Sequence, residues 1–261
     1  MIADHLTITP IPFAHDNYLW LLDDGHHAVL VDPGAAAPAL AVLKTRGLIP
    51  LAILLTHHHA DHTAGVAGLV ARYGGTQLPV YGPQKEAIPG VTHPLTAGDT
   101  VHLPALALDF QVLDVAAHTR GHIAYLAAEM LFCGDALFSA GCGRLFEGNA
   151  LDLQRTLTRL ARLPPSTRVY CAHEYTLSNL AFARAAEPDN PERNRYAAQC
   201  EALRAKNEPT LPTTIAIERA VNPFLRCDEK SVQNTVSAHT RRDPRDPLSC
   251  LTALRAWKDV F

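Results

Sequence analysis

The sequence has neither a basic excess nor a long apolar run, and both shortages limit what the protein can be. Its net charge of −3 at pH 7 does not supply the strongly basic surface that nucleic-acid binding requires. Its apolar stretches fall well short of the roughly 20 residues that a membrane-spanning helix needs. We therefore expect neither a nucleic-acid partner nor insertion into a membrane.

Closely spaced cysteines are also missing. The six cysteines are scattered and none forms a CxxC pair, which argues against a zinc finger or a thioredoxin-like protein. Scattered cysteines fit buried thiols in a reducing compartment. Residues 1–5 contain no basic region that leads into an apolar stretch, so we expect no signal peptide. The expectation is a monomer in the cytoplasm.

The composition is otherwise that of an ordinary globular protein, with 261 residues of which 48% are apolar and 19% charged. The order of elements changes along the chain. Strands are expected at residues 18–22, 28–32, 53–56, 110–115, 124–128, 130–133 and 168–172, with helices at 37–46, 63–73 and 151–163. Helices alone are expected afterwards, at residues 175–186, 193–206 and 247–258. We predict a mixed α/β domain over residues 1–173 and a helical domain over residues 174–261.

One segment concentrates potential metal ligands. His57, His59, Asp61 and His62 occupy four of six consecutive positions, directly after the apolar run at residues 51–55. In an extended backbone, His57 and His59 point to the same side and can share a cation. A helix that starts after this loop would turn Asp61 and His62 toward a second cation. Imidazole and carboxylate ligands suit zinc, iron or manganese better than calcium.

Three further candidates follow expected strands. They are His118, Asp135 and His173, and each comes at or shortly after the end of a strand. Ligands at the ends of separate strands can converge at one edge of a sheet. Any one of them alone would more often be structural. Together, five histidines and two aspartates exceed what one four-coordinate ion uses and suit two ions that share a carboxylate.

These residues carry a family resemblance. The ordered ligand candidates, with the turns at residues 32–34 and 118–122, resemble the metallo-β-lactamase superfamily. Over almost its whole length the chain more narrowly resembles the glyoxalase II family, the hydroxyacylglutathione hydrolases. The narrower resemblance is carried by residues 16–18, 133–135, 140–148, 173–176, 212–214 and 222–226.

The resemblance implies an α/β fold, namely a four-layer αββα sandwich followed by a C-terminal helical domain. It also implies two divalent metal ions, with zinc as the first choice and iron and manganese as alternatives. One ion would be held by His57, His59 and His118, and the other by Asp61, His62 and His173. Asp135 and a hydroxide would bridge the two ions, which makes Asp61 and Asp135 the expected catalytic residues.

The implied activity is hydrolysis of a glutathione thioester. The enzyme would cleave S-(2-hydroxyacyl)glutathione, typically S-D-lactoylglutathione, to glutathione and D-lactate in methylglyoxal detoxification. The metal-bridging hydroxide would attack the thioester carbonyl. The leaving thiol has a pKa near 8.5, so its expulsion needs no strong protein acid. No serine or cysteine nucleophile is therefore expected.

Glutathione carries two carboxylates and calls for cationic side chains. The resemblance assigns its contacts to Arg144, Phe146, Tyr175, Arg255 and Lys258. Arg255 and Lys258 lie three residues apart and would share one helix face. The family commonly has lysine at position 144 and tyrosine at position 146. Arg144 keeps the charge, but Phe146 loses a hydroxyl, so we expect weaker or differently posed glutathione binding.

Two classes of alternative remain at this point. One is another enzyme of the superfamily, such as a persulfide dioxygenase with one iron, a lactonase or a β-lactamase. The other is a non-catalytic module that binds metal for folding or storage. Structural zinc sites are usually rich in cysteine, whereas these ligands are histidines and aspartates. Turnover of S-lactoylglutathione would separate the alternatives; the metal in the cell and the preferred acyl group stay open.

Overall fold

The computed structural model describes residues 6–74, 78–241, 243–244 and 246–261. Residues 1–5, on which the expectation about a signal peptide rests, lie outside the described residues. So does Gly75, the second of the two glycines that follow the expected helix at residues 63–73. Within the described part of the chain, no helix is long and apolar enough to cross a membrane. All six cysteines are buried free thiols, as predicted.

The chain forms two compact units. The first comprises Met1–Val115 and Thr119–Gly134, and the second comprises Ala116–His118 and Asp135–Phe261. The chain passes between the units after Val115, after His118 and after Gly134. This division differs from the predicted domain boundary after His173, because Asp135 and the segment that follows it group with the helices.

The first unit contains a sheet of six strands in the order β1 to β6. The strands are β1 (Thr7–Phe13), β2 (Asn17–Asp23), β3 (His27–Val31), β4 (Ile49–Leu54), β5 (Val80–Pro83) and β6 (His93–Leu95). Neighbours are antiparallel from β1 to β3 and parallel from β3 to β6. Strands β2 and β3 are buried almost throughout, which explains their nearly continuous apolar sequence.

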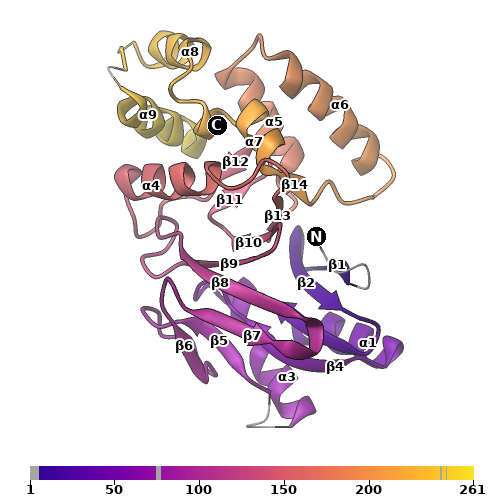
Figure 1. Ribbon diagram of the computed structural model, residues 1–261. Helices are drawn as coiled ribbons and strands as arrows, with labels where there is room; N and C mark the ends of the chain where they lie inside the picture. The colour runs from indigo at the N-terminus through magenta and orange to yellow at the C-terminus, as the bar shows by residue number, and fades with distance from the viewer. Residues whose placement is uncertain (1–5, 75–77, 242, 245) are drawn as a thin grey trace. The chain divides into compact units, whose positions relative to one another are not determined.

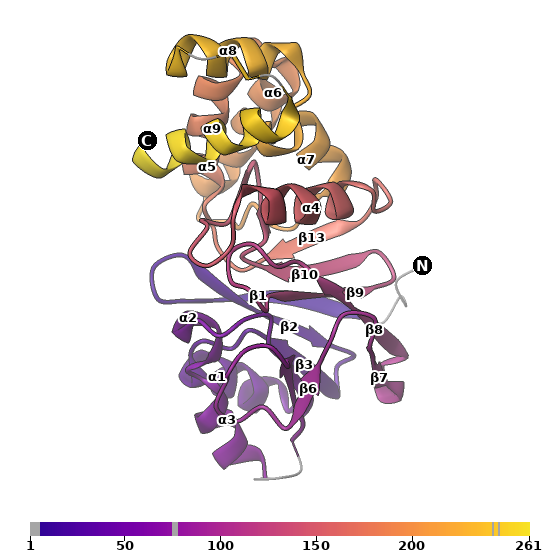
Figure 2. The same ribbon diagram turned by 90° about the vertical axis from the view of Figure 1, so that its left-hand side faces the viewer.

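Helices pack on one face of this sheet. They are α1 (Ala36–Arg46), α2 (Ala60–Thr63) and α3 (Val66–Tyr73). Buried residues of α1 and α3 join those of the strands in one apolar cluster, and Figures 1 and 2 show both helices against the sheet. Helix α1 ends at Arg46 and is capped by Gly47, whose φ of 66° is left-handed. The predicted helix at 63–73 is shorter than expected, since α2 already ends at Thr63 and α3 begins only at Val66.

The second sheet of this unit is an antiparallel meander. Its strands are β7 (Thr100–Leu103), β8 (Leu108–Asp114), β9 (Ile123–Ala127) and β10 (Met130–Gly134), and a short 3-10 turn, η2 (Pro104–Leu106), joins the first two. Two hydrogen bonds join β9 to the residues just after β4. The Tyr125 hydroxyl donates to the Leu55 carbonyl at 2.9 Å, and the Ile123 amide donates to the Thr56 carbonyl at 3.0 Å. These bonds fix the segment from which the histidine-rich loop departs.

The second unit is mainly helical (Figures 1 and 2). Its helices are α4 (Ala150–Ala161), α5 (Thr176–Ala186), α6 (Pro191–Arg204), α7 (Ile215–Val221), α8 (Lys230–Thr240) and α9 (Pro247–Val260), with a 3-10 turn η3 (Pro223–Leu225). Its short strands are β11 (Leu137–Phe138), β12 (Gly141–Cys142), β13 (Arg168–Cys171) and β14 (Thr213–Thr214). Helix α5 packs on α6, and α9 packs on α4 and α8.

Strands β11 and β12 form a hairpin, residues 137–142, that the surrounding helices hold by its backbone. The Asn179 amide of α5 donates to the Ser139 carbonyl at 3.1 Å, and Asn222, after α7, donates to the Gly141 carbonyl at 2.9 Å. Arg255 of α9 donates to the Cys142 carbonyl at 3.0 Å. Because this hairpin directly follows Asp135 and precedes Arg144, the helices define the course of the chain between two predicted site residues.

A buried carboxylate completes these contacts. Glu218 of α7 is inaccessible to solvent and accepts hydrogen bonds from the Ala140 amide, the Thr213 hydroxyl and the Asn222 amide group. Ala140 has a φ of 55°, a left-handed conformation that a residue with a Cβ adopts only at some cost. Burial raises the pKa of Glu218 to about 7, although the three hydrogen bonds act in the opposite direction.

This raised pKa predicts a pH dependence of stability. The Glu218 pKa lies above its ordinary value of 4.5, so the folded protein holds this proton more tightly than the unfolded chain does. The stability that protonation contributes is complete below pH 4.5 and is lost as the pH rises through about 7. Between pH 4.5 and about pH 7 the free energy of unfolding of the wild type should therefore fall by about 3 kcal/mol. The variant Glu218→Gln should not show this fall, because a glutamine side chain does not titrate.

Urea unfolding of wild type and Glu218→Gln across this pH range measures the difference. Glu201, an exposed residue of α6, provides the control, and Glu201→Gln should keep the wild-type slope. Equal slopes for Glu218→Gln and wild type would show that Glu218 does not titrate in this window.

Candidate metal centre

The first unit brings the four clustered ligand candidates together at the end of β4. His57 and His59 lie in an extended segment, and the Nε2 atom of His57 is 3.1 Å from the Nδ1 atom of His59. Helix α2 begins at Ala60, which turns Asp61 and His62 in a new direction. The Nε2 atom of His62 lies 3.7 Å from the Oδ2 atom of Asp61. The two pairs predicted from the spacing are therefore both formed.

Asp32 holds the segment at residues 56–62 in place. Its carboxylate, which is almost fully buried, accepts hydrogen bonds from the Thr56 amide at 2.8 Å and from the Thr56 hydroxyl at 2.7 Å. The same carboxylate lies 2.9 Å from the Nδ1 atom of His62. Asp32 follows β3 in a left-handed conformation with a φ of 49°, which aspartate tolerates better than most residues. One carboxylate thus orients both ends of the ligand segment.

Asp61 is fixed by contacts of its own. The Asn17 side chain at the start of β2 donates to the Asp61 carboxylate at 3.0 Å. Gly34 lies so close beneath that a Cβ there would be 1.9 Å from the Asp61 carbonyl oxygen. This glycine is therefore required for the close approach of the turn at residues 32–34 to α2.

The second unit brings together the other three candidates. Asp135 is buried between two histidines: its Oδ2 atom lies 3.4 Å from Nε2 of His118, and its Oδ1 atom lies 3.4 Å from Nε2 of His173. A carboxylate that bridges two metal ions must direct its two oxygens to different ions, and the two oxygens of Asp135 do face different imidazoles. The Nδ1 atom of His118 lies 2.7 Å from the Arg144 carbonyl, which leaves Nε2 as the nitrogen that can bind a cation.

The distances within each unit fit a metal ion. Two ligand atoms of a tetrahedral zinc ion lie about 3.3 Å apart, since each bond is about 2.0–2.1 Å long. The four pairs described above are separated by 3.1, 3.7, 3.4 and 3.4 Å. In addition, His57, His62 and His118 each direct the other ring nitrogen to an oxygen, as metal-binding histidines usually do.

Two predicted substrate contacts lie beside these histidines in the second unit. Phe146 is 61% exposed, and its ring meets the His118 ring edge-on at 5.2 Å between centroids. The Tyr175 ring stacks on that of His173 at 4.6 Å with an angle of 8° between the planes. An exposed aromatic ring and a half-buried one are therefore available next to the candidate ligands.

The predicted cationic contacts have different surroundings. Arg144 is exposed and donates to the Asp259 carboxylate at 3.2 Å, and Arg255 donates to the same oxygen at 3.0 Å. The Arg255 side chain is only 7% exposed, because its guanidinium group also lies against the hairpin backbone and the Phe224 ring. Burial lowers the pKa of Lys258, whose ammonium group lies 5.3 Å from the centre of the Phe182 ring.

Three carboxylates that support these residues were not predicted as site residues from the sequence. Asp32 was noted only as part of a family turn, whereas Glu86 and Asp259 were not singled out. Glu86 contacts His58, which lies between two ligand candidates, and accepts a hydrogen bond from Gly121, which follows His118. Asp259 joins two predicted glutathione contacts. Asp32 had a sequence signal in the turn at residues 32–34, and Asp259 had one in its i,i+4 spacing from Arg255. Glu86 acts through Thr119 and Gly121, which lie far away in the chain.

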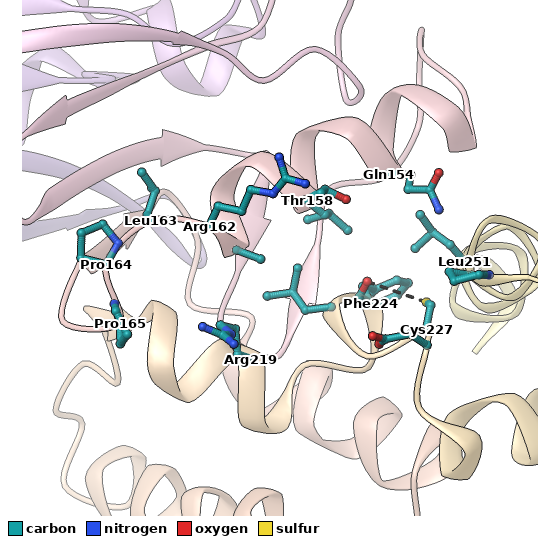
Figure 3. Close-up of a pocket in the computed structure, with 15 residues that line it drawn as sticks. Gln154, Thr158, Arg162, Leu163, Pro164, Pro165, Arg219, Phe224, Cys227 and Leu251 are labelled. Carbon is teal, nitrogen blue, oxygen red and sulfur yellow. Dashed lines mark hydrogen bonds between the residues drawn. The ribbon is translucent and has the colours of Figure 1, made fainter.

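A separate cavity of about 710 Å³ lies within the second unit between α4, α7, η3 and α9 (Figure 3). Leu157, Phe224 and Leu251 contribute buried apolar surface to it, and Arg162 and Arg219 are exposed at its edge. No predicted site residue is among the described residues that line this cavity. It is therefore distinct from the candidate metal centre.

Comparison with known proteins defines the class. A family model described as the metallo-beta-lactamase superfamily matches residues 15–173, and one described as the hydroxyacylglutathione hydrolase C-terminus matches residues 174–261. The fold is therefore the predicted α/β metallo-β-lactamase domain followed by a helical C-terminal part. The fold and the donor set together define a divalent metal site.

The relatives narrow the class further. Hydroxyacylglutathione hydrolase from Cupriavidus taiwanensis is 53% identical and that from Nitrosomonas eutropha 48% identical; each alignment covers 98% of this chain and 99% of the relative. The crystal structure of TTHA1623 in a di-iron-bound form is 31% identical, with a TM-score of 0.58 over 83% of this chain and all of that one. The chain belongs to the hydroxyacylglutathione hydrolase family, a family of metal-dependent thioester hydrolases, which confirms the predicted resemblance.

The contacts of Asp32 predict a loss of metal affinity when its carboxylate is removed. Asp32→Asn replaces an oxygen that accepts from Thr56 or His62 with an amide that cannot accept. Zinc affinity, measured against a competing chromophoric chelator, should fall by about 10- to 100-fold. Asp24→Asn is the matched control, since Asp24 also lies beside a histidine, His27, but in an outlying turn. Unchanged affinity in Asp32→Asn would remove Asp32 from the support of the ligands.

Proposed function

We propose that this protein hydrolyses S-(2-hydroxyacyl)glutathione, typically S-D-lactoylglutathione, to glutathione and a 2-hydroxy acid, in methylglyoxal detoxification. The observation that carries the proposal is the Asp135 carboxylate, whose oxygens face His118 and His173, in a chain about half identical to named hydroxyacylglutathione hydrolases. The relatives' names favour this activity over the other enzymes of the superfamily and over a non-catalytic module.

We further propose how seven ligands divide between two ions. His57, His59 and His118 would hold one ion, Asp61, His62 and His173 the other, and Asp135 would bridge them. The connectivity supports this arrangement, because His118 and Asp135 are each one peptide bond from the first unit. The related protein TTHA1623, whose structure contains two iron ions, supports a pair of metals. Zinc is the proposed metal, and iron and manganese accept the same ligands.

The protein's own residues would perform two tasks in the reaction, beside a bound metal ion. A bound divalent ion lowers the pKa of water from about 15.7 to about 7 and so makes a nucleophile available at neutral pH. Asp61 and Asp135, the proposed catalytic residues, would orient that nucleophile through their carboxylates. Asp32 keeps His62 in one orientation by its contact with Nδ1. The departing thiolate, whose conjugate acid has a pKa near 8.5, needs no protein proton donor.

Recognition of the glutathione part is proposed for Arg144, Phe146, Tyr175, Arg255 and Lys258. Arg144 and Phe146 are exposed, so they can meet a substrate directly, and Phe146 lies beside His118. Arg255 is largely enclosed and would act through the edge of its guanidinium group and through the hairpin that it holds. Residues 174–261 would form the domain that contributes Tyr175, Arg255 and Lys258, and residues 1–173 the catalytic domain. The cytoplasmic location and the monomeric state stay predictions.

A thioester assay after metal removal tests the proposed function. The protein as purified should release free thiol from S-D-lactoylglutathione, detected with a thiol reagent. Chelation followed by dialysis should abolish this release while circular dichroism still reports a folded chain, and zinc should restore it. A protein that contains metal and is folded but releases no thiol from any acyl-glutathione would refute the assignment.

Position 146 provides a finer test of substrate recognition. Phe146→Tyr adds a hydroxyl group to an exposed ring next to His118, and one new hydrogen bond to glutathione contributes about 0.5–1.5 kcal/mol. The KM for the thioester should therefore fall by about 2- to 10-fold, with kcat little changed. Phe146→Leu, which removes the ring without adding a hydroxyl group, serves as the control and should not lower KM. A KM equal to that of wild type in Phe146→Tyr would exclude this hydroxyl from glutathione binding.

A further inference from the structure

We propose that Glu86 is a positioning residue for the metal centre, because its carboxylate joins the His57–His59 segment to the segment that follows His118. The proposal rests on the proposed function only in taking these histidines as metal ligands. Glu86 itself touches none of them and would act through the residues between them.

Glu86 lies in the turn after β5, and its side chain is only 4% exposed. Its two oxygens have different partners. Oε2 lies 3.0 Å from the Nδ1 atom of His58. Oε1 accepts from the Gly121 amide at 3.0 Å and from the Thr119 hydroxyl. A single enclosed carboxylate therefore contacts two segments that are about 60 residues apart in the chain.

The first contact bears on the orientation of the neighbouring histidines. His58 lies between His57 and His59, and its ring meets the His59 ring edge-on at 4.9 Å between centroids. When the side chain of His58 is held on the Glu86 side of an extended segment, those of His57 and His59 are directed to the opposite side. The contact with Glu86 therefore selects the rotation of the backbone that presents both candidate ligands together.

The second contact bears on the segment after His118. Thr119, the next residue, is fully buried and donates its hydroxyl to Glu86. At Gly121, a Cβ would lie 2.5 Å from Cγ of Glu86, so only glycine lets the backbone amide come this close. His122 then stacks on the ring of His57 at 4.5 Å with an angle of 15°. The segment at residues 119–122, which Glu86 holds, therefore also contacts His57 in the first ligand segment.

The comparison of Glu86 with Asp23 makes the proposal testable. Asp23 is another buried carboxylate of the first unit, paired with Arg46 at 2.6 Å and hydrogen-bonded to the Gly25 amide. Its described contacts lie away from both ligand segments. Loss of either carboxylate should lower the unfolding temperature, but only loss of Glu86 should weaken metal binding.

The experiment measures zinc dissociation constants by competition with a chromophoric chelator, together with unfolding temperatures, for wild type and four variants. Glu86→Ala should weaken zinc binding by about 10- to 100-fold, the usual effect of removing a group that orients a metal ligand. Glu86→Gln, which keeps one oxygen for Thr119 and Gly121, should recover part of this loss. Thr119→Val should weaken binding by a few-fold, and Asp23→Asn should keep the wild-type constant at a lowered unfolding temperature.

Two results would overturn the proposal. One is wild-type zinc affinity in the Glu86 variants, and the other is an equal loss in Asp23→Asn, which would make the effect one of general stability. If Glu86→Ala does not fold, the zinc affinities of Glu86→Gln and Thr119→Val test the proposal instead. Wild-type zinc affinity in both of these variants would then overturn it. Thiol release by the wild-type enzyme is measured in parallel. Its absence would refute the proposed hydrolysis and leave the zinc comparison valid.

Discussion

The first group of ligand candidates depends on the buried carboxylate of Asp32. A charged group with so little exposure is tolerated only when donors surround it, and here the Thr56 amide, the Thr56 hydroxyl and His62 do so. The same contacts determine where the histidine-rich segment leaves β4 and which nitrogen of His62 faces away from Asp32. The hydrogen bonds that satisfy the buried carboxylate thus also hold the ligand residues in one orientation.

The second unit achieves the same result with backbone contacts. Asp135 is followed at once by the hairpin at residues 137–142, whose carbonyl and amide groups are bound by side chains from α5, α7, α9 and the residue after α7. The position of Asp135 is thus constrained on its C-terminal side by helices that contribute no predicted metal ligand. In this unit the helical part holds the segment that follows Asp135 in place.

Much of the arrangement of the ligand candidates could be predicted because it depends on residues that are close together in the sequence. The alternation of His57 and His59 predicted that their nitrogens would meet, and the position of Asp135 after an apolar strand predicted its place at the end of β10. Local sequence patterns did not predict contacts between residues that are far apart in the chain. Asp32 and Thr56 are 24 residues apart, and Arg255 and Cys142 are 113 apart, so no periodicity reveals either contact.

Some elements were missed for reasons that are equally physical. Strand β1 contains Pro10 and Pro12, which argue against a strand unless it lies at an edge, where β1 indeed lies. Helix α8 buries only Val232 and Val236 and so lacks a full apolar stripe. The boundary after His173 followed the change from strands to helices. The two family models also meet there, whereas the compact units divide after Gly134, because the hairpin after Asp135 has its partners among the helices.

The cationic residues show why a role assigned by sequence needs the surroundings of each side chain. Arg255 was expected to share a helix face with Lys258 and to contact glutathione, yet its guanidinium group is enclosed and bound to the Cys142 carbonyl and to Asp259. An enclosed guanidinium that lost these partners would be strongly destabilising, so its first requirement is structural. Arg144 shares Asp259 but remains exposed, so its ion pair contributes little to stability and would leave Arg144 able to pair with a carboxylate of the proposed substrate. The two arginines therefore have different proposed roles: Arg255 fixes the hairpin and would meet glutathione only through the edge of its guanidinium group, whereas Arg144 presents an exposed charge.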